Sequence, residues 1–373
     1  MRKSFRVAAL FSLLSLFSMS SHAVEPIIVG QSAALTGPAN LLGSEMARGM
    51  NAYFNQVNEK GGINGRQIKL VTLDDGYEPD RTVANTKQLI SEEHAVALVG
   101  YVGTPTSLAA LPVVKASGLP FIGAYTGADS LRDGKYENVF NIRASYNDEA
   151  LRIATEIDGM GLHTMGIVIQ KDAFGDAGLN AIKAALARHP DIKVLWTETV
   201  ERNSVNVDAA VAKIISGHVD TVYVVSAYKT ESALITKARS AGYVGLFTTL
   251  SFVGTEPLAQ LAGAAARGVV VPAVMPSPHS EPILLSGEYH RAMAAGTTAP
   301  SFSYASMEGY VAARVFVEAA RRVNGKINAE SINASMHALK MDLSGFKLDF
   351  TQSNGASKWV ETTVIGANGK ISR

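Results

Sequence analysis

The chain has 373 residues, of which 47% are hydrophobic and 18% charged, and it contains no cysteine. This composition excludes a collagen-like, coiled-coil or disordered chain, and the length is sufficient for more than one domain core. The 34 basic residues nearly balance the 33 acidic ones, which argues against a nucleic-acid-binding surface.

The N-terminus has the pattern of a secretory signal peptide. Basic residues within the first six positions precede an apolar run over 7–17, and Ser21-His22-Ala23 offers small residues at a cleavage site. The apolar run is too short to anchor the chain in a bilayer. We therefore expect residues 1–23 to be removed, which leaves 350 residues with 31 basic and 33 acidic side chains and a net charge of −2.

The expected compartment is a bacterial periplasm. A lipid anchor needs a cysteine at the cleavage site, and the sequence has none. The mature protein should therefore diffuse freely after export, and its retention implies an outer membrane around it. No later apolar run approaches the ~18 uncharged residues of a membrane span.

Beyond the leader, short β-branched runs alternate with amphipathic helical stretches. The predicted elements, in chain order, are strand 27–33, helix 44–58, strand 67–74, helix 81–93, strand 96–100, helix 107–117, strand 164–169, helix 175–188, strand 192–199, helix 207–216, strand 221–226, helix 230–241, strand 245–250, strand 268–272, helix 302–323, helix 329–338, strand 346–350 and strand 360–365. Strict alternation predicts an α/β fold with parallel sheets covered by helices on both faces. Two such sheets fit the length better than one, and the Gly/Pro-rich segment 271–282 resembles a crossover between them.

Motifs of catalysis and metal binding are missing from the sequence. It contains no G-x-x-x-x-G-K-[ST], no G-x-S-x-G and no H-E-x-x-H, and its histidines are scattered. Asp74-Asp75 closes a predicted strand and is expected to form a turn with solvated carboxylates rather than a metal pair. We therefore expect neither a cofactor nor a metal, and no enzymatic activity.

Polar, Gly-rich loops directly follow two predicted strands of the first half. One contains Tyr101 and Thr104 and leads into a helix, and the other contains Tyr125, Thr126 and Gly127. The carboxyl ends of parallel strands are where such folds bind ligands. A hydroxyl beside a helix N-terminus suits a carboxylate, because the unpaired N–H groups and the helix dipole favour an anion. The alternative is that the hydroxyls only cap the helix.

Aromatic and polar residues occupy similar positions in the second half. Tyr228 and Ser251 follow predicted strands, and Phe174 begins a predicted helix. Each aromatic residue fits an ordinary core position as well as a ligand contact.

The mature chain resembles the type I periplasmic substrate-binding proteins of the leucine/isoleucine/valine-binding family. The most specific segment is NQVNEKGGINGRQIKLVTLDD at 55–75. Further matching segments are LTGPANLLG at 35–43, VGYVGTPTSLAALP at 99–112, KDAFGDAG at 171–178 and ARSAGY at 238–243.

This resemblance implies two Rossmann-like lobes with parallel sheets, joined by three crossovers and closing on a small ligand by a hinge. The expected first lobe comprises 24–143 and 275–345, and the second 144–274 and 346–373. The implied function is carriage of a ligand to the membrane permease of an ABC importer by a monomeric protein.

The resemblance also implies ligand-binding positions. Thr104 keeps the hydroxyl of the family's carboxylate-binding serine. The backbone loop falls on Tyr125 to Gly127, where Gly127 replaces a threonine whose hydroxyl Thr126 can supply. Leu42 stands where amino-acid binders carry an aromatic wall.

In the second lobe, Phe174 keeps the ring of a family tyrosine without its hydroxyl, and Tyr228 matches a second tyrosine. Ser251 stands where amino-acid binders carry the glutamate that pairs with the ligand's ammonium. Burying an ammonium without an anion is costly. Either another acid, such as Glu308 or Asp172, reaches the site, or the ligand is a carboxylate without an amino group, including an aromatic one.

Two other functions remain open. A sensory receptor on the same fold would signal ligand binding to a membrane kinase, and one soluble chain does not distinguish it from a transport protein. An enzyme is the third class, which the missing catalytic motifs disfavour.

Overall fold

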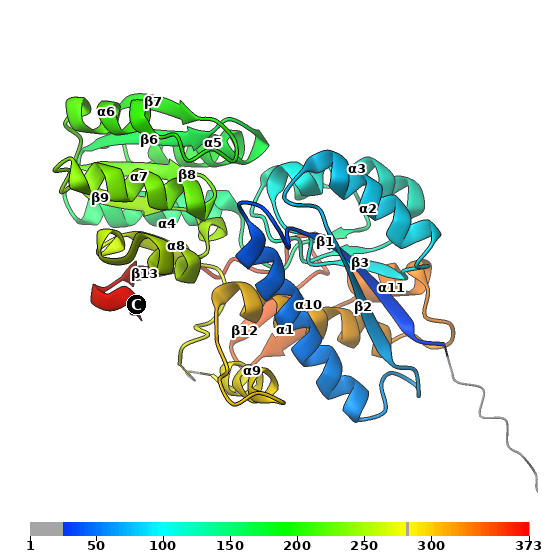
Figure 1. Ribbon diagram of the computed structural model, residues 1–373. Coiled ribbons are helices and arrows are strands. Elements are labelled where there is room, and N and C mark those ends of the chain that lie inside the picture. The colour runs from blue at the N-terminus through cyan, green and yellow to red at the C-terminus, as the bar shows by residue number, and fades with distance from the viewer. Residues whose placement is uncertain (1–24, 281–282, 373) are drawn as a thin grey trace, which may run out of the picture.

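The computed structural model describes residues 25–280 and 283–372, and the expected signal peptide lies outside them. Two parallel-sheet lobes lie side by side (Figure 1). The first sheet has the order β2-β1-β3-β4-β5, and the second has the order β14-β13-β10-β9-β8-β6-β7. The predicted α/β fold with two parallel sheets is therefore confirmed.

The first lobe is built from consecutive βα units. Its strands are β1 (Ile27–Ala33), β2 (Ile68–Asp74), β3 (Ala97–Val99), β4 (Phe121–Ile122) and β5 (Val139–Phe140). Its early helices are α1 (Asn40–Glu59), α2 (Pro79–Ser91) and α3 (Thr104–Ser117), with the short 3-10 turn η1 (Asp129–Leu131) before β5. The apolar side chains of α1 from Met50 to Val57 belong to one core cluster, whereas Leu42 and Met46 at the start of α1 share the other cluster with α2 and α3.

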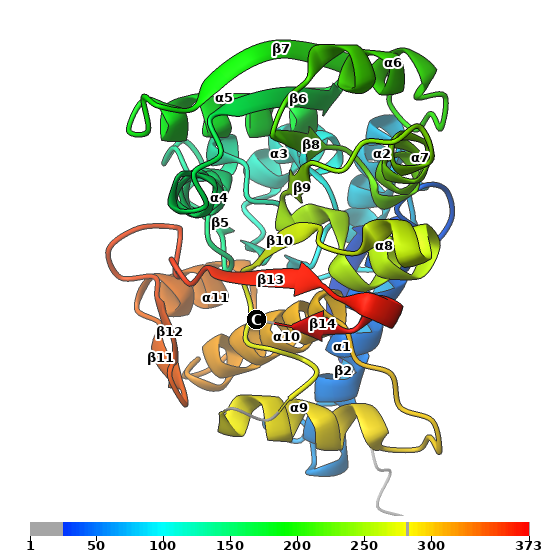
Figure 2. The same ribbon diagram turned by 90° about the vertical axis from the view of Figure 1, so that its left-hand side faces the viewer.

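Later segments complete this lobe. The helices α9 (Leu284–Ala294), α10 (Tyr304–Arg321) and α11 (Ala329–His337) share a core cluster with α1, as does the hairpin of β11 (Lys340–Leu343) and β12 (Phe346–Asp349). Figure 2 shows α9, α10 and the hairpin grouped beneath the second sheet. Phe346 and Leu348 are buried in this cluster, so the β11–β12 hairpin packs with the helices of the first lobe.

The second lobe repeats the βα arrangement. Its elements are α4 (Tyr146–Gly159), β6 (Thr164–Gln170), α5 (Ala173–Leu186), β7 (Lys193–Val200), α6 (Asp208–Gly217), β8 (Thr221–Val225), α7 (Tyr228–Ser240), β9 (Leu246–Thr249), η2 (Ser251–Val253), α8 (Thr255–Ala262), η3 (Gly263–Ala266) and β10 (Val270–Ala273). The C-terminal β13 (Glu361–Ile365), η4 (Ala367–Gly369) and β14 (Ile371–Ser372) extend this sheet in the antiparallel direction.

Helix α4 is not among the predicted elements, although its N-terminus carries a strong local signal. Ser145 accepts a hydrogen bond from the backbone of Asp148, whose side chain bonds back to the Ser145 N–H. This reciprocal capping box is a sequence-level start signal for a helix. The helix follows the first crossover and opens the second lobe, so its omission removed a site-forming element from the prediction.

Strand order reverses beside β1 in the first sheet and beside β6 in the second. Helices on opposite faces leave a crevice at the carboxyl ends of the strands at such a point. Both crevices lie where the lobes meet, and the loops after β2, β3, β4, β6, β8 and β9 therefore approach one another there.

Candidate functional site

A pair of hydroxyl groups lies at the start of α3 in the first lobe. Thr104 Oγ1 is 2.6 Å from Thr126 Oγ1, and both side chains are fully buried. Gly103 precedes Thr104 with φ +106, and a Cβ there would lie 2.3 Å from the ring of Tyr77. The left-handed backbone and the close ring both require glycine. The paired hydroxyls and the helix N-terminus form a site suited to a carboxylate.

Backbone hydrogen bonds tie together the two loops that carry these threonines. Tyr125 N donates to Tyr101 O at 2.7 Å, and Gly103 N donates to Tyr125 O at 3.3 Å. Gly127 leaves room for the ring of Tyr146, which a Cβ would approach to 2.4 Å. The Tyr101 side chain lies apart from the hydroxyl pair, because its Oη is 3.1 Å from Thr86 Oγ1 on α2.

Aromatic rings from both lobes meet beside the hydroxyl pair. The ring of Phe252 has centroids of three other rings within 6 Å: Phe174 at 4.5 Å, Tyr125 at 5.8 Å and Tyr77 at 5.9 Å. Tyr146 lies 5.7 Å from Phe174, and all of these side chains are buried. We call these five residues the aromatic cluster. Offset and tilted rings of this kind form an apolar wall suited to a flat or branched apolar group.

Tyr125 and Phe174 of the aromatic cluster are among the residues proposed from the sequence, whereas Tyr77, Tyr146 and Phe252 are not. Tyr77 follows β2 and is held by Asp75, whose Oδ1 accepts the Tyr77 N–H at 2.9 Å. The expectation that Asp75 is solvated is wrong, because this side chain is fully buried and bonded by Ser32. The available signal for all three was position, since each lies directly after a strand or crossover.

Two predicted residues contact the opposite lobe at the α1 side of the site. Tyr228 Oη donates to Asn40 Oδ1 at 2.8 Å and accepts from Leu41 N at 3.2 Å. Leu42 packs against Gly254, where an added Cβ would lie 2.6 Å from Leu42 Cδ2. Tyr228 and Leu42 therefore belong to the contact between the lobes.

Ser251 lies directly against a buried carboxyl that the sequence analysis missed. Glu149 Oε2 accepts from Ser251 N at 2.7 Å, and Glu149 Oε1 accepts from Ser251 Oγ at 2.9 Å. Burial raises the pKa of Glu149 to about 7, although Arg143 and the Ser251 hydrogen bonds oppose that rise. Glu149 of α4 thus places a carboxyl directly beside Ser251, the position where the sequence has no acid.

The two acids proposed from the sequence are bonded to other protein groups. Glu308 accepts from Arg143 Nε at 2.8 Å and from Arg143 Nη2 at 2.7 Å, and both side chains are 1% exposed. Arg143 also donates to Ser251 Oγ at 3.1 Å, and its guanidinium carbon lies 4.0 Å from the centroid of the Tyr125 ring. Asp172 caps α5 by accepting from Phe174 N at 2.9 Å.

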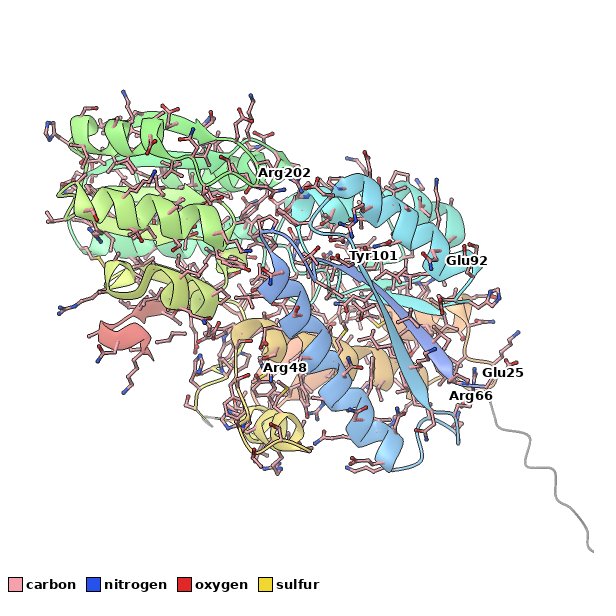
Figure 3. The ribbon with its side chains drawn as sticks, in the orientation of Figure 1. Glu25, Arg48, Arg66, Glu92, Tyr101 and Arg202 are labelled. Carbon is pink, nitrogen blue, oxygen red and sulfur yellow. The ribbon has the colours of Figure 1, made fainter. Side chains whose placement is uncertain are left out.

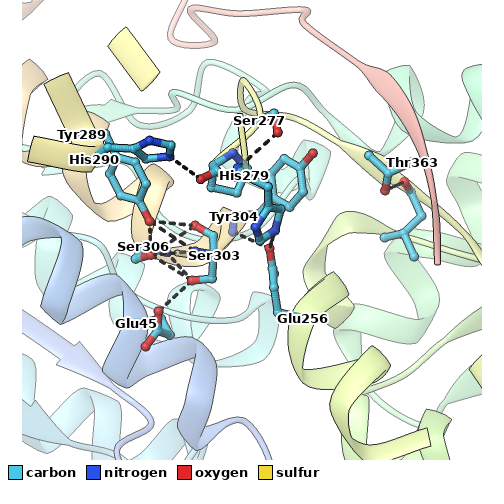
Figure 4. Close-up of polar contacts among 12 residues, drawn as sticks. Glu45, Glu256, Ser277, His279, Tyr289, His290, Ser303, Tyr304, Ser306 and Thr363 are labelled. Carbon is cyan, nitrogen blue, oxygen red and sulfur yellow. Dashed lines mark hydrogen bonds and ion pairs between the residues drawn. The ribbon is translucent and has the colours of Figure 1, made fainter. Parts of the chain in front are cut away.

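Further polar contacts join the lobes near the second crossover (Figure 4). Glu256 of α8 lies 2.8 Å from His279 Nε2 and accepts from Tyr304 N at 3.1 Å. A small cavity lies between this region and Ser251, lined in part by Tyr125, Arg143, Ser251, Tyr304 and Glu308. Within the described part of the chain, no helix is long and apolar enough to cross a membrane, and no cluster of His, Cys, Asp and Glu could hold a metal ion.

Comparison with known proteins agrees with this architecture. The sequence pattern of a family described as periplasmic binding protein matches residues 26–358. An amino acid binding protein of Pseudomonas aeruginosa is 26% identical over 70% of each chain.

Two solved structures are also similar. A possible leucine/isoleucine/valine-binding protein from Rhodopirellula baltica is 33% identical, with a TM-score of 0.87 over 94% of this chain and 97% of that one. A substrate-binding periplasmic protein from Ralstonia solanacearum is 31% identical, with a TM-score of 0.88 over 92% and 99% of the two chains.

Proposed function

Because this chain belongs to the periplasmic binding protein family, we propose that it is the solute-binding component of an ABC importer in the periplasm. Its ligand is an amino acid with an apolar side chain, bound between the lobes by hinge closure. The observation that carries this proposal is the convergence of a hydroxyl pair, an aromatic cluster and a buried acid on one site. The closed complex would then dock transiently on a membrane permease.

The carboxylate end of the ligand is assigned to the first lobe. Thr104 and Thr126 supply hydroxyl donors, and α3 adds the positive end of its dipole. Hydrogen bonds to a charged acceptor are roughly twice as strong as those between neutral groups. These groups belong to one lobe, so they can receive the ligand before closure.

The ammonium end is assigned to Glu149 and Ser251 in the second lobe. Each Glu149 oxygen accepts one hydrogen bond from Ser251 and retains a second acceptor site. A cation beside this buried carboxyl favours its charged form and offsets its desolvation. The acid is therefore supplied by α4, and Ser251 positions it.

The apolar body of the ligand is assigned to the aromatic cluster. Tyr77 and Tyr125 belong to the first lobe, and Phe174 and Phe252 belong to the second. A ligand that touches both sets has differential affinity for the closed arrangement, and only such a difference can shift the equilibrium.

A thermal-shift comparison of matched ligand pairs tests this proposal. Leucine is compared with 4-methylpentanoate and phenylalanine with 3-phenylpropanoate, each pair differing only in the amino group. Refolded protein excludes carry-over of bound ligand, and a ligand at 100 times its Kd adds about 2.7 kcal/mol to the folded state. Stabilisation by the amino acids alone supports the proposal. Stabilisation by the deaminated acids alone overturns the role of Glu149, and no stabilisation by any carboxylate overturns the ligand class.

A further inference from the structure

Arg202 reaches from the second lobe to the first. It lies in the loop between β7 and α6, and Figure 3 shows it where the two lobes adjoin. Its side chain is only 19% exposed despite its position at the surface of the lobe junction.

The guanidinium of Arg202 contacts the loop that carries Tyr77. Nη1 lies 2.9 Å from Glu78 Oε2, and Nη2 donates to the backbone carbonyl of Tyr77. The guanidinium carbon is 4.8 Å from the centroid of the Tyr77 ring, a cation–π distance. Asn203 adds a hydrogen bond of 2.9 Å from Nδ2 to Glu78 Oε1.

The backbone on both sides is shaped for this contact. Tyr77 has φ +68 and Asn203 has φ +61. A left-handed conformation is costly for a bulky residue and persists only where its surroundings hold it. Asp75 supplies that restraint on the first lobe by accepting the N–H groups of Tyr77 and Glu78.

Within its own lobe, Arg202 also faces the start of α5. Arg202 Nε lies 3.2 Å from Asp172 Oδ2, and Asp172 caps the helix turn that carries Phe174. Arg202 thus contacts Tyr77 of the first lobe and also Asp172, the residue that caps the helix turn of Phe174. These two rings flank Phe252 from opposite lobes.

We propose that Arg202 is a latch whose contacts with Tyr77 and Glu78 stabilise the closed arrangement of the lobes whatever ligand lies between them. When the lobes separate, these contacts break, whereas the pair with Asp172 stays within one lobe. The latch rests on the proposed function, and it sets how long a ligand is retained rather than which ligand is chosen. Glu78 is 48% exposed, so solvent screens that ion pair and the buried Tyr77 carbonyl contributes more.

The test measures lobe separation without any ligand. The chain has no cysteine, so Glu92→Cys on the first lobe and Lys183→Cys on the second accept a donor and acceptor dye at unique sites. Both positions are exposed. Arg202→Ala in this background is expected to lower the ratio of closed to open molecules about tenfold, as for other truncated charge pairs.

Lys171→Ala is the matched control. It removes a neighbouring positive charge whose partner, Glu201, lies 3.0 Å away in the same lobe. The control should leave the dye distances unchanged. Arg202→Lys should give an intermediate result, because an ammonium cannot contact the carbonyl, Glu78 and Asp172 at once.

A double-mutant cycle with Glu78→Ala and Arg202→Ala checks that the two residues act together across the lobes. If they were independent, their effects on the free energy of closure would add. Identical dye distances in the Arg202→Ala variant and the parent overturn the latch, even if leucine binds. A shift toward open molecules with no binding of any tested acid would retain the latch and overturn the proposed function instead. Thermal unfolding of each variant verifies that the lobes remain folded.

Discussion

Glu149 and Ser251 are 102 positions apart in the chain, yet both oxygens of the glutamate accept hydrogen bonds from that one serine. Ser251 stands where related amino-acid binders carry the glutamate that pairs with the ligand's ammonium. Glu149 of α4 places a carboxyl beside that serine instead. The following four predictions concern this pair and other residues of the site.

Glu149→Gln is expected to weaken binding of leucine or phenylalanine by about tenfold or more, since it removes a charge-assisted partner of the ammonium. Binding of their deaminated counterparts should change little. Isothermal titration of both ligand pairs against the parent and the variant provides the measurement. Equal losses for the aminated and deaminated ligands would show that Glu149 does not recognise the ammonium.

As the pH rises from about 4.5 to about 7, ionisation of Glu149 should lower the free energy of unfolding of the ligand-free protein. Burial raises its pKa from 4.5 to about 7, so the folded state holds a proton that the unfolded state releases. The resulting stability is present below the unfolded pKa and is lost as the pH rises through the folded pKa, by at most about 3 kcal/mol. Urea unfolding at pH 5 and pH 8 measures this loss, and Glu149→Gln should reduce it. Parallel pH profiles for the parent and the variant would contradict the expectation.

Thr104→Val removes one hydroxyl from the expected carboxylate site while conserving side-chain volume. We expect binding of carboxylate ligands to weaken by about tenfold to a hundredfold, with the fold retained. Thr221→Val is the matched control. Thr221 is also fully buried, but its hydroxyl has no hydrogen-bond partner. It begins β8, whereas the loops of the site follow the carboxyl ends of the strands. A similar loss of binding in both variants would assign the effect to packing.

Breaking the Arg143–Glu308 pair should destabilise the protein strongly. Both side chains are 1% exposed, and removal of either partner leaves an uncompensated buried charge that costs about 3–5 kcal/mol. We expect Glu308→Gln to lower the urea midpoint and Arg143→Met combined with Glu308→Leu to recover much of the loss. If the double variant were as unstable as the sum of the single ones, the pair would not act as a unit.

Local sequence patterns determined the architecture because they reflect local physical constraints. Parallel strands buried on both faces appear as short apolar runs, and amphipathic helices repeat their apolar residues every three or four positions. The strand-end loops with Thr104 and Tyr125 to Gly127 were identified for a related reason. Parallel strands all present their carboxyl ends at one edge, so the position of a loop in the alternation predicts its place in the fold.

Only the tertiary structure decided which distant residues meet. Tyr77 contacts Phe252 across the two lobes, whereas Glu149 meets Ser251 within the second lobe and Arg143 meets Glu308 within the first. Asp75 is a further example, since its buried position depends on Ser32 and Thr82 closing around it. No periodicity or motif encodes such pairings, because their free energy arises from burial and charge compensation that exist only after the chain has folded.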